Sequence, residues 1–244
     1  MVIKYKPNAL DFKDFQFLQE VMTTDPAYGR QAFPQYSFLP KDEPAENDIE
    51  NILRAITPGR EHIEYWFRWN DQAPWHVDGD EILFKQKMES SSMVFKNKKQ
   101  ELDYNPEDPN SSRIARTTNI LYLFIQNIIG GELEICTSHP WDGKYILNNK
   151  YEPPLGAHIT TIRPFENMAV QFPSNLYHRV RNFIPKLEGF AMKRLALVWC
   201  YWDHHPEGYK DHKHWKIFFR DGAGEKFVPA RGWGDISPHR NYNI

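Results

Sequence analysis

The sequence contains few cysteines and no long apolar run. Cys136 and Cys200 are the only two cysteines in 244 residues, and they form no CxxC pair. Neither a disulfide framework nor a thiolate zinc site is therefore expected, and any metal must be held by nitrogen and oxygen ligands. The longest apolar runs, ILYLFIQNII and LALVWCYW, are shorter than the roughly 18 residues that a membrane-spanning helix needs. A membrane protein is not expected.

An excess of one charge is also lacking. The chain has 30 basic and 32 acidic residues, a net charge of −2, and no basic stripe of the kind that binds nucleic-acid backbones. The first residues, MVIKYKPNALDFKDF, lack the apolar stretch of a secretory signal. We therefore expect a cytoplasmic protein without a nucleic-acid partner, and the composition gives no indication of its oligomeric state.

Apolar residues are abundant enough for a full core. They make up 41% of the chain, which predicts a single domain over residues 1–244. Helical spacing in LDFKDFQFLQEVMTTDP predicts a first helix, and Asn47 or Asp48 can cap a second helix that Pro58 and Gly59 end. We interpret the proline-rich AFPQYSFLPKDEP as a loop between them. A helical N-terminal layer is thus predicted for about residues 1–62.

The sequence becomes β-rich from about residue 63. Aromatic and β-branched residues dominate EHIEYWFRWND, RIARTTNILYLFIQN, IGGELEICT, HITTIRPFENMAVQF and KRLALVWCYWD. Many strands with short turns predict a mainly β fold with flanking helices, whose core over about 63–203 is a double-stranded β-helix of the jelly-roll, cupin-like type. A C-terminal extension is expected at 204–244. The polar residues 85–113 are expected to form a hairpin or lid beside the site.

A candidate metal site begins in APWHVDGDEILF, where one residue separates His76 from Asp78. In an extended chain these two side chains point to the same side, while Val77 points away. The pair alone is weak, because polar turns often hold such residues, so its interpretation depends on His178 after VQFPSNLY. Two imidazoles and one carboxylate leave open positions on a metal, as in non-heme Fe(II) oxygenases. The three residues are therefore candidate iron ligands.

A ferrous site that activates O₂ needs further electrons, which in this class often come from a bound 2-oxo acid. The far carboxylate of such an acid needs a fixed cation, and AMKRLALVWCYW offers Lys193 and Arg194. We favour Arg194, because a guanidinium matches a carboxylate bidentately and an ammonium does not. Neighbouring strand residues face opposite ways, so only one of the two can serve, and Lys193 stays the alternative.

Four sequence blocks occur in an order that resembles a known family. His-x-Asp, LYLFIQNIIGGELEI, IRPFENMAVQFPSNLYHRV and RLALVW together resemble the 2-oxoglutarate- and Fe(II)-dependent dioxygenases of the prolyl-hydroxylase-like group, over about residues 64–202. The resemblance implies Fe(II) held by His76, Asp78 and His178, and 2-oxoglutarate bound by Arg194 with help from Tyr122. It implies no catalytic side chain beyond the metal ligands. An aspartate at position 78 favours hydroxylation over halogenation, because related halogenases have a small residue there.

The implied reaction is hydroxylation of an unactivated C–H bond of a small molecule, with O₂ as co-substrate and release of succinate and CO₂. Family frequency favours an amino acid or a derivative of one as the substrate. The spacing between the two histidines is longer than is usual in the family, and the additional residues, 85–112 and 138–158, are candidate substrate loops. The cation also follows the second histidine at a longer spacing than is usual.

Two other functions are alternatives to the hydroxylase. A non-redox cupin-like binding protein or metal-assisted isomerase would use His76 and His178 as cavity residues and would need no cation after His178. A nucleic-acid demethylase of the same family is disfavoured, because residues 195–203 contain no second arginine. The histidine-rich WDHHPEGYKDHKHW is expected to be a solvated loop and not the metal site.

Overall fold

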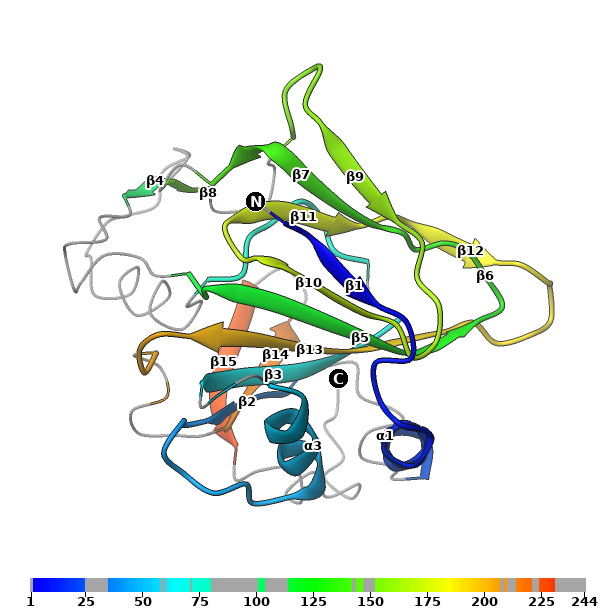
Figure 1. Cartoon of the computed structure of the whole chain (residues 1–244). Coiled ribbons are helices and arrows are strands. Elements are labelled where there is room, and N and C mark those ends of the chain that lie inside the picture. The colour runs from blue at the N-terminus through cyan, green and yellow to red at the C-terminus, as the bar shows by residue number, and fades with distance from the viewer. Residues whose placement is uncertain are drawn as a thin grey trace.

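The fold is taken from a computed structural model of the chain (Figure 1). The structure describes residues 2–24, 35–57, 59, 61–70, 72–79, 101–103, 114–141, 144–146, 152–206, 209, 214–220 and 224–230. These contain the helices α1 (Phe12–Thr24) and α3 (Asp48–Ile56). The strands are β1 (Lys4–Lys6), β2 (Gln35–Leu39), β3 (His62–Trp69), β4 (Glu101–Asp103), β5 (Thr117–Gln126), β6 (Ile128–Gly130), β7 (Leu133–Pro140), β8 (Lys144–Ile146), β9 (Ile159–Ile162), β10 (Ala169–Pro173), β11 (Leu176–Val180), β12 (Phe183–Pro185), β13 (Lys193–Trp202), β14 (His214–Arg220) and β15 (Gly224–Ala230).

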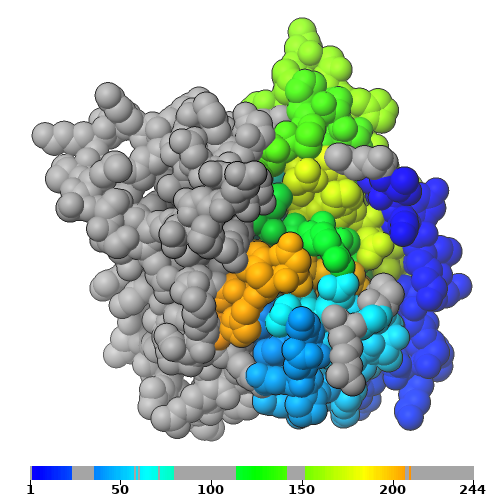
Figure 2. All heavy atoms as spheres, turned by 60° about the vertical axis from the view of Figure 1, so that its left-hand side comes forward, coloured from blue at the N-terminus to red at the C-terminus, as the bar shows by residue number. Residues whose placement is uncertain are grey.

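A large antiparallel sheet forms the middle layer of the molecule. Its eight strands have the order β1-β10-β5-β13-β3-β2-β14-β15. The long strand β13 lies between β5 and β3 and is buried along nearly its whole length. Because both of its faces are covered, its sequence is an almost continuous apolar run, as the strand prediction required. The N-terminal residues, blue in Figure 2, lie along one flank, where β1 pairs with β10.

A smaller sheet, with the order β11-β7-β9, faces the large one (Figure 1). Residues 76–79 extend its β11 edge through an isolated bridge between His76 and His178. Apart from β7 and β9, which pair with each other in the small sheet, successive segments alternate between the sheets: β3, β5, β10 and β13 belong to the large sheet, and 76–79, β7, β9 and β11 lie at the small one. This alternation is the winding of a double-stranded β-helix. The predicted mainly β fold with flanking helices and a jelly-roll core is confirmed.

Two apolar layers lie on opposite faces of the large sheet. Leu121 and Leu123 of β5 pack with α1 and α3, whereas Ile120 and Tyr122 of the same strand face the small sheet. In Figure 1 both helices lie below the large sheet and the small sheet lies above it. The alternation along β5 therefore separates a structural core from the space between the sheets, where polar residues gather.

Neither of the described helices has the length and apolar character to cross a membrane.

The prediction of a loop over AFPQYSFLPKDEP was wrong in part. The structure forms β2 there, paired with β3 and β14. Tyr36 and Phe38 point between the two sheets. Leu39 belongs to the apolar layer between the large sheet and the two helices, which we call the helix-side core. Pro40 directly follows the strand, where a missing N–H breaks no ladder bond. Alternating apolar residues between the prolines were the overlooked signal.

Strands also form outside the predicted core boundaries. β1 and β2 come from the predicted helical layer, and β14 and β15 come from the predicted C-terminal extension, yet all four join the large sheet. The division of a single domain into 1–62, 63–203 and 204–244 stays a prediction. Of the predicted lid over 85–113, only β4 is described, and it pairs with β8. The remainder of that lid lies outside the described residues.

The start of α3 has a side-chain cap. The Glu50 backbone N–H donates to the Asn47 side-chain oxygen at 2.9 Å, so of the two predicted caps Asn47 is the one used. The Glu50 carboxylate in turn accepts from the Glu46 backbone N–H at 2.7 Å and from the Tyr65 hydroxyl at 2.9 Å. The cap thus connects the helix to the large sheet through a buried carboxylate.

Removal of this cap should lower stability. We expect Asn47→Ala to reduce the free energy of unfolding by about 1 kcal/mol, because the Glu50 N–H loses its acceptor. Urea unfolding measures the change. Asn51→Ala, at an exposed position of the same helix, is the matched control and should change stability little. Equal losses in both variants would contradict the capping role.

Candidate metal centre

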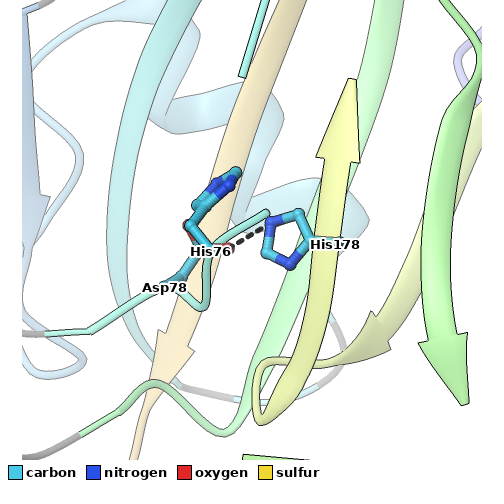
Figure 3. A group of neighbouring side chains, drawn as sticks. All are labelled: His76, Asp78 and His178. Atoms are coloured by element: carbon cyan, nitrogen blue, oxygen red, sulfur yellow. Dashed lines mark ion pairs between the residues drawn. The ribbon is translucent and has the colours of Figure 1, made fainter. Parts of the chain in front are cut away.

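His76 and His178 lie opposite each other in a two-residue antiparallel bridge. The His76 backbone N–H donates to the His178 carbonyl at 3.0 Å, and the His178 N–H donates to the His76 carbonyl at 2.9 Å. Side chains of such a pair emerge on the same side of the sheet, and the two imidazole centroids are 4.2 Å apart (Figure 3). The backbone itself therefore brings together two histidines that are distant in sequence.

Asp78 joins the histidines because it lies two residues after His76. The Asp78 Oδ1 atom is 3.8 Å from His76 Nε2, and Oδ2 is 3.4 Å from His178 Nε2. Val77 points away and packs with Trp75 and Tyr177, as the predicted alternation requires. One ligand atom from each of the three residues lies within 4.8 Å of the others, and the described residues contain no second group of this kind.

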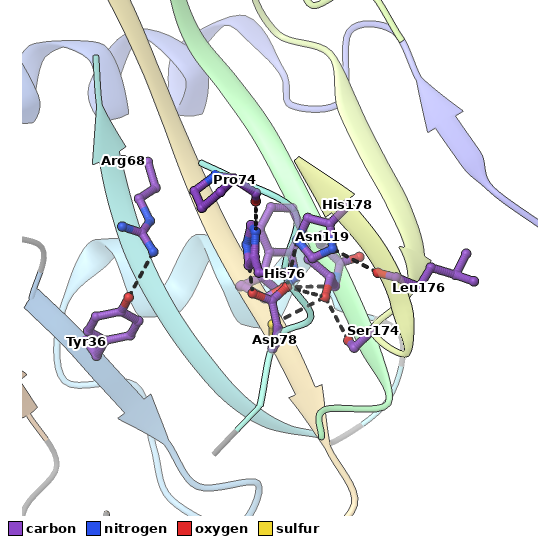
Figure 4. A network of polar contacts seen from close by, with 12 residues as sticks. Tyr36, Arg68, Pro74, His76, Asp78, Asn119, Ser174, Leu176 and His178 are labelled. Atoms are coloured by element: carbon purple, nitrogen blue, oxygen red, sulfur yellow. Dashed lines mark hydrogen bonds and ion pairs between the residues drawn. The ribbon is translucent and has the colours of Figure 1, made fainter. Parts of the chain in front are cut away.

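The hydrogen bonds of both imidazoles determine which nitrogen has the free lone pair. His76 Nδ1 is 2.7 Å from the Pro74 carbonyl oxygen, and His178 Nδ1 is 3.0 Å from the Leu176 carbonyl oxygen (Figure 4). A carbonyl only accepts, so each Nδ1 carries the proton and each Nε2 presents its lone pair. Two lone pairs and a carboxylate therefore converge on one point. This is how metal-ligating histidines are commonly oriented.

The electrostatics of the group favour the metal-binding protonation states. Burial, and after it the neighbouring His178, lower the pKa of His76 to about 4, although Asp78 partly opposes the change. Burial raises the pKa of Asp78, but His178, His76 and the Thr118 hydrogen bond lower it more, so the net shift is below its ordinary value. At neutral pH the site holds a neutral His76 and an ionised Asp78. Metal ligands need these forms.

The three residues line a cavity between the two sheets of about 40 Å³. Arg194 of β13 lines the same cavity, and its side chain is buried. The guanidinium carbon lies 5.5 Å from the Tyr122 ring centroid and 6.0 Å from the Phe183 centroid. Lys193 instead places its ammonium 5.7 Å from the ring of Phe124, which belongs to the helix-side core. Of the two candidate cations, Arg194 is therefore the one that shares the cavity with the histidines.

Local backbone features hold Arg194 in place. The Asn70 backbone N–H donates to the Arg194 carbonyl at 2.6 Å, and the Arg194 N–H donates to the Asn70 side chain at 2.8 Å. In the Gly-Gly turn, a Cβ on Gly130 would lie 2.3 Å from the Asn182 carbonyl oxygen. A Cβ on Gly131 would lie 3.4 Å from Arg194 Cδ. The two glycines thus allow β6 and the following chain to approach β12 and the arginine closely.

Comparison of the sequence with protein-family models and with curated proteins finds no match. Solved structures do match. They include a prolyl-4-hydroxylase from Pseudomonas putida (14% identity, 83% of this chain and 93% of that chain, TM-score 0.43) and a 2OG-Fe(II) oxygenase family oxidoreductase from Burkholderia pseudomallei (12%, 84% and 85%, 0.45). HygX from Streptomyces hygroscopicus, with nickel and 2-oxoglutarate bound, also matches (14%, 96% and 94%, 0.42).

The matched structures are of the kind that the motif order predicted. The chemistry of this chain has to follow from its own side chains.

The histidine-rich segment after β13 forms no metal-binding group among its described residues. His205 packs against Phe38, with ring centroids 4.6 Å apart, and His204 contacts the neighbouring Asp203. Of its remaining residues, 207, 208 and 210–213 lie outside the described part of the chain.

Two buried hydroxyl residues beside the site, Thr118 and Ser174, are not among the predicted site residues. Thr118 Oγ1 lies 2.7 Å from Asp78 Oδ2 and 2.7 Å from Ser174 Oγ. Serine and threonine have no distinguishing pattern in a strand or turn, so only the packing of β5 against 76–79 reveals them. Arg68 also lines the cavity and donates to the Tyr36 hydroxyl at 3.1 Å (Figure 4).

His76 should make the stability of the metal-free protein depend on pH. Its pKa is about 4 in the folded chain against an ordinary 6.5, so between these values the unfolded chain takes up a proton that the folded chain does not. Stability is complete above pH 6.5 and falls as the pH drops toward 4. Urea unfolding of metal-free protein across this range should show the decrease, and His76→Gln should flatten it. His139→Gln, at an exposed position, should not.

Proposed function

We propose that this chain is an Fe(II)- and 2-oxoglutarate-dependent oxygenase that hydroxylates a C–H bond of a small molecule, an amino acid or a derivative of one. The observation that carries the proposal is the convergence of two Nε2 lone pairs and one carboxylate at a cavity that also contains a buried arginine. The composition further supports action in the cytoplasm, without a nucleic-acid partner. The choice of an amino acid comes from the sequence resemblance alone.

The donor set fits a ferrous ion. His76 and His178 would each supply Nε2 and Asp78 would supply one oxygen, which leaves the remaining coordination positions for co-substrates. Fe(II) with 2-oxoglutarate, when bound, supplies the oxidation: O₂, 2-oxoglutarate and R–H give R–OH, succinate and CO₂. Asp78 neutralises part of the metal charge within a partly buried site.

The residues around Arg194 fit a carboxylate. The Tyr122 hydroxyl is buried, and none of the described residues accepts its proton. Burial raises the pKa of Tyr122 more than Arg194 lowers it, so the hydroxyl keeps that proton and can donate it. A carboxylate beside the guanidinium would accept from both groups. We therefore assign Arg194 and Tyr122 to the far carboxylate of 2-oxoglutarate.

The remaining wall of the cavity is apolar. It consists mainly of aliphatic side chains, namely Ala73, Ile120, Leu133, Val180, Ala196 and Val198. Trp66 and Arg68 complete the lining, but the aliphatic side chains offer no competing proton donor or acceptor and keep water from the metal side. It suits a reaction that removes hydrogen from an unactivated carbon. A non-redox cupin-like protein would have no use for Arg194 in this position.

The ligand assignment can be tested without knowledge of the substrate. Anaerobic addition of Fe(II) and 2-oxoglutarate should give the weak visible metal-to-ligand charge-transfer band, and His76→Ala should abolish it. His139→Ala, which changes an exposed histidine, should retain the band. A wild-type protein without the band would refute the proposed function. Succinate release across a panel of amino acids, peptides and lipidic acids then identifies the substrate class.

The arginine assignment has a matched control one residue away. We expect Arg194→Met to raise the Kd for 2-oxoglutarate by about 30-fold or more, since loss of one partner of a buried charge pair costs about 2 to 5 kcal/mol. Lys193→Met should change it by less than about threefold, because Lys193 faces the helix-side core. Titration of the charge-transfer band with 2-oxoglutarate measures both values. The reverse order would assign the role to Lys193.

A further inference from the structure

Three buried side chains from different elements meet beside Asp78. Thr118 lies on β5, Ser174 lies in the turn between β10 and β11, and Cys200 lies on β13, and all three are fully buried. Thr118 Oγ1 is 2.7 Å from Asp78 Oδ2, 2.7 Å from Ser174 Oγ and 3.6 Å from Cys200 Sγ. Thr118 is thus the centre of a small polar cluster inside an otherwise apolar layer.

The donor and the acceptor of each hydrogen bond in this cluster follow from the ionised Asp78 carboxylate. Asp78 only accepts when ionised, so the single Thr118 hydroxyl proton is donated to Asp78 Oδ2. The Thr118 oxygen then accepts, and the Ser174 hydroxyl is the donor at 2.7 Å. The chain Ser174 to Thr118 to Asp78 therefore has one direction. Each donation strengthens the next.

We propose that Thr118 is a positioning residue for the metal-binding carboxylate, with Ser174 as its supporting donor. This inference rests on the proposed metal site. The hydrogen bond engages Oδ2 and fixes the plane of the Asp78 carboxylate, so that the group would offer a metal one oxygen. A carboxylate free to rotate could use both oxygens and occupy a position that the co-substrates need.

The fold gives Asp78 little other support. Residues 76–79 are held by isolated bridges, His76 to His178 and Gly79 to Ile114, and not by a continuous strand ladder. Thr118 belongs to the central strand β5 of the large sheet. Ser174 lies in the turn that leads to the strand of His178. Figure 4 shows Ser174 near the Asp78 carboxylate. The two hydroxyls thus connect the carboxylate, the large sheet and the strand of the second histidine.

The test is the affinity for Mn(II), followed through the electron paramagnetic resonance signal of the free ion. We expect Thr118→Val, which keeps the shape and removes the hydroxyl, to raise the Kd by about 10- to 100-fold. Thr118→Ser restores the donor and should bind within about threefold of wild type. Ser174→Ala should weaken binding less than Thr118→Val does. Thr117→Val, the same change on the opposite face of β5, should leave the Kd unaltered.

A purely structural role would give a different result. It would lower the melting temperature of metal-free Thr118→Val and leave the Mn(II) Kd at the wild-type value, and this outcome would overturn the inference. If Thr118→Val does not fold, an unchanged Kd in Ser174→Ala would overturn it equally. Failure of the wild-type protein to bind Mn(II) would refute the metal site itself. Tight wild-type binding with no effect of either hydroxyl would refute only the positioning role.

Discussion

The pair of backbone hydrogen bonds between His76 and His178 is the constraint on which the site depends. It attaches residues 76–79 to the edge of the small sheet. It also makes the two imidazoles neighbours, although they are roughly one hundred residues apart in the sequence. Both imidazole rings are oriented by the same local hydrogen bond: each Nδ1 donates to the carbonyl of the residue two positions earlier, Pro74 or Leu176. An extended backbone thus orients each ligand by itself, and the bridge brings the two oriented ligands together.

The charge balance of the site follows from its place between the sheets. Burial alone would favour a protonated Asp78, yet two imidazoles and the Thr118 hydroxyl keep its pKa below the ordinary value. The same burial keeps His76 neutral. A carboxylate that faces two lone pairs with no proton between them is electrostatically unfavourable by itself, and a bound cation makes the same arrangement favourable. Backbone carbonyls order the two imidazoles, and the Thr118 hydroxyl orders the carboxylate.

The sequence contained most of the information on the candidate ligands and less on their surroundings. His76, Asp78 and His178 could be predicted because strand alternation and motif order both selected them. Thr118 and Ser174 could not, because their role arises from how β5 packs on 76–79 and on the turn after β10. β2 was missed because the segment is rich in prolines, although Pro40 lies after the last residue of its ladder. In each case the deciding factor was a contact between distant segments, which local propensity does not report.

The choice between Lys193 and Arg194 shows what the sequence could have decided. On the Lys193 side of β13 follow Leu195, Leu197, Trp199 and Tyr201, all in the helix-side core. On the Arg194 side the smaller Ala196, Val198 and Cys200 come first, and Trp202 follows at the end of the strand. Small residues leave room for a ligand, and large ones fill a core, so the size pattern already favours Arg194. The same strand therefore closes the structural core with one face and forms the cavity wall with the other. A slip of one residue would place the large side chains in the cavity and the arginine among apolar groups, so stability and site formation select the same register.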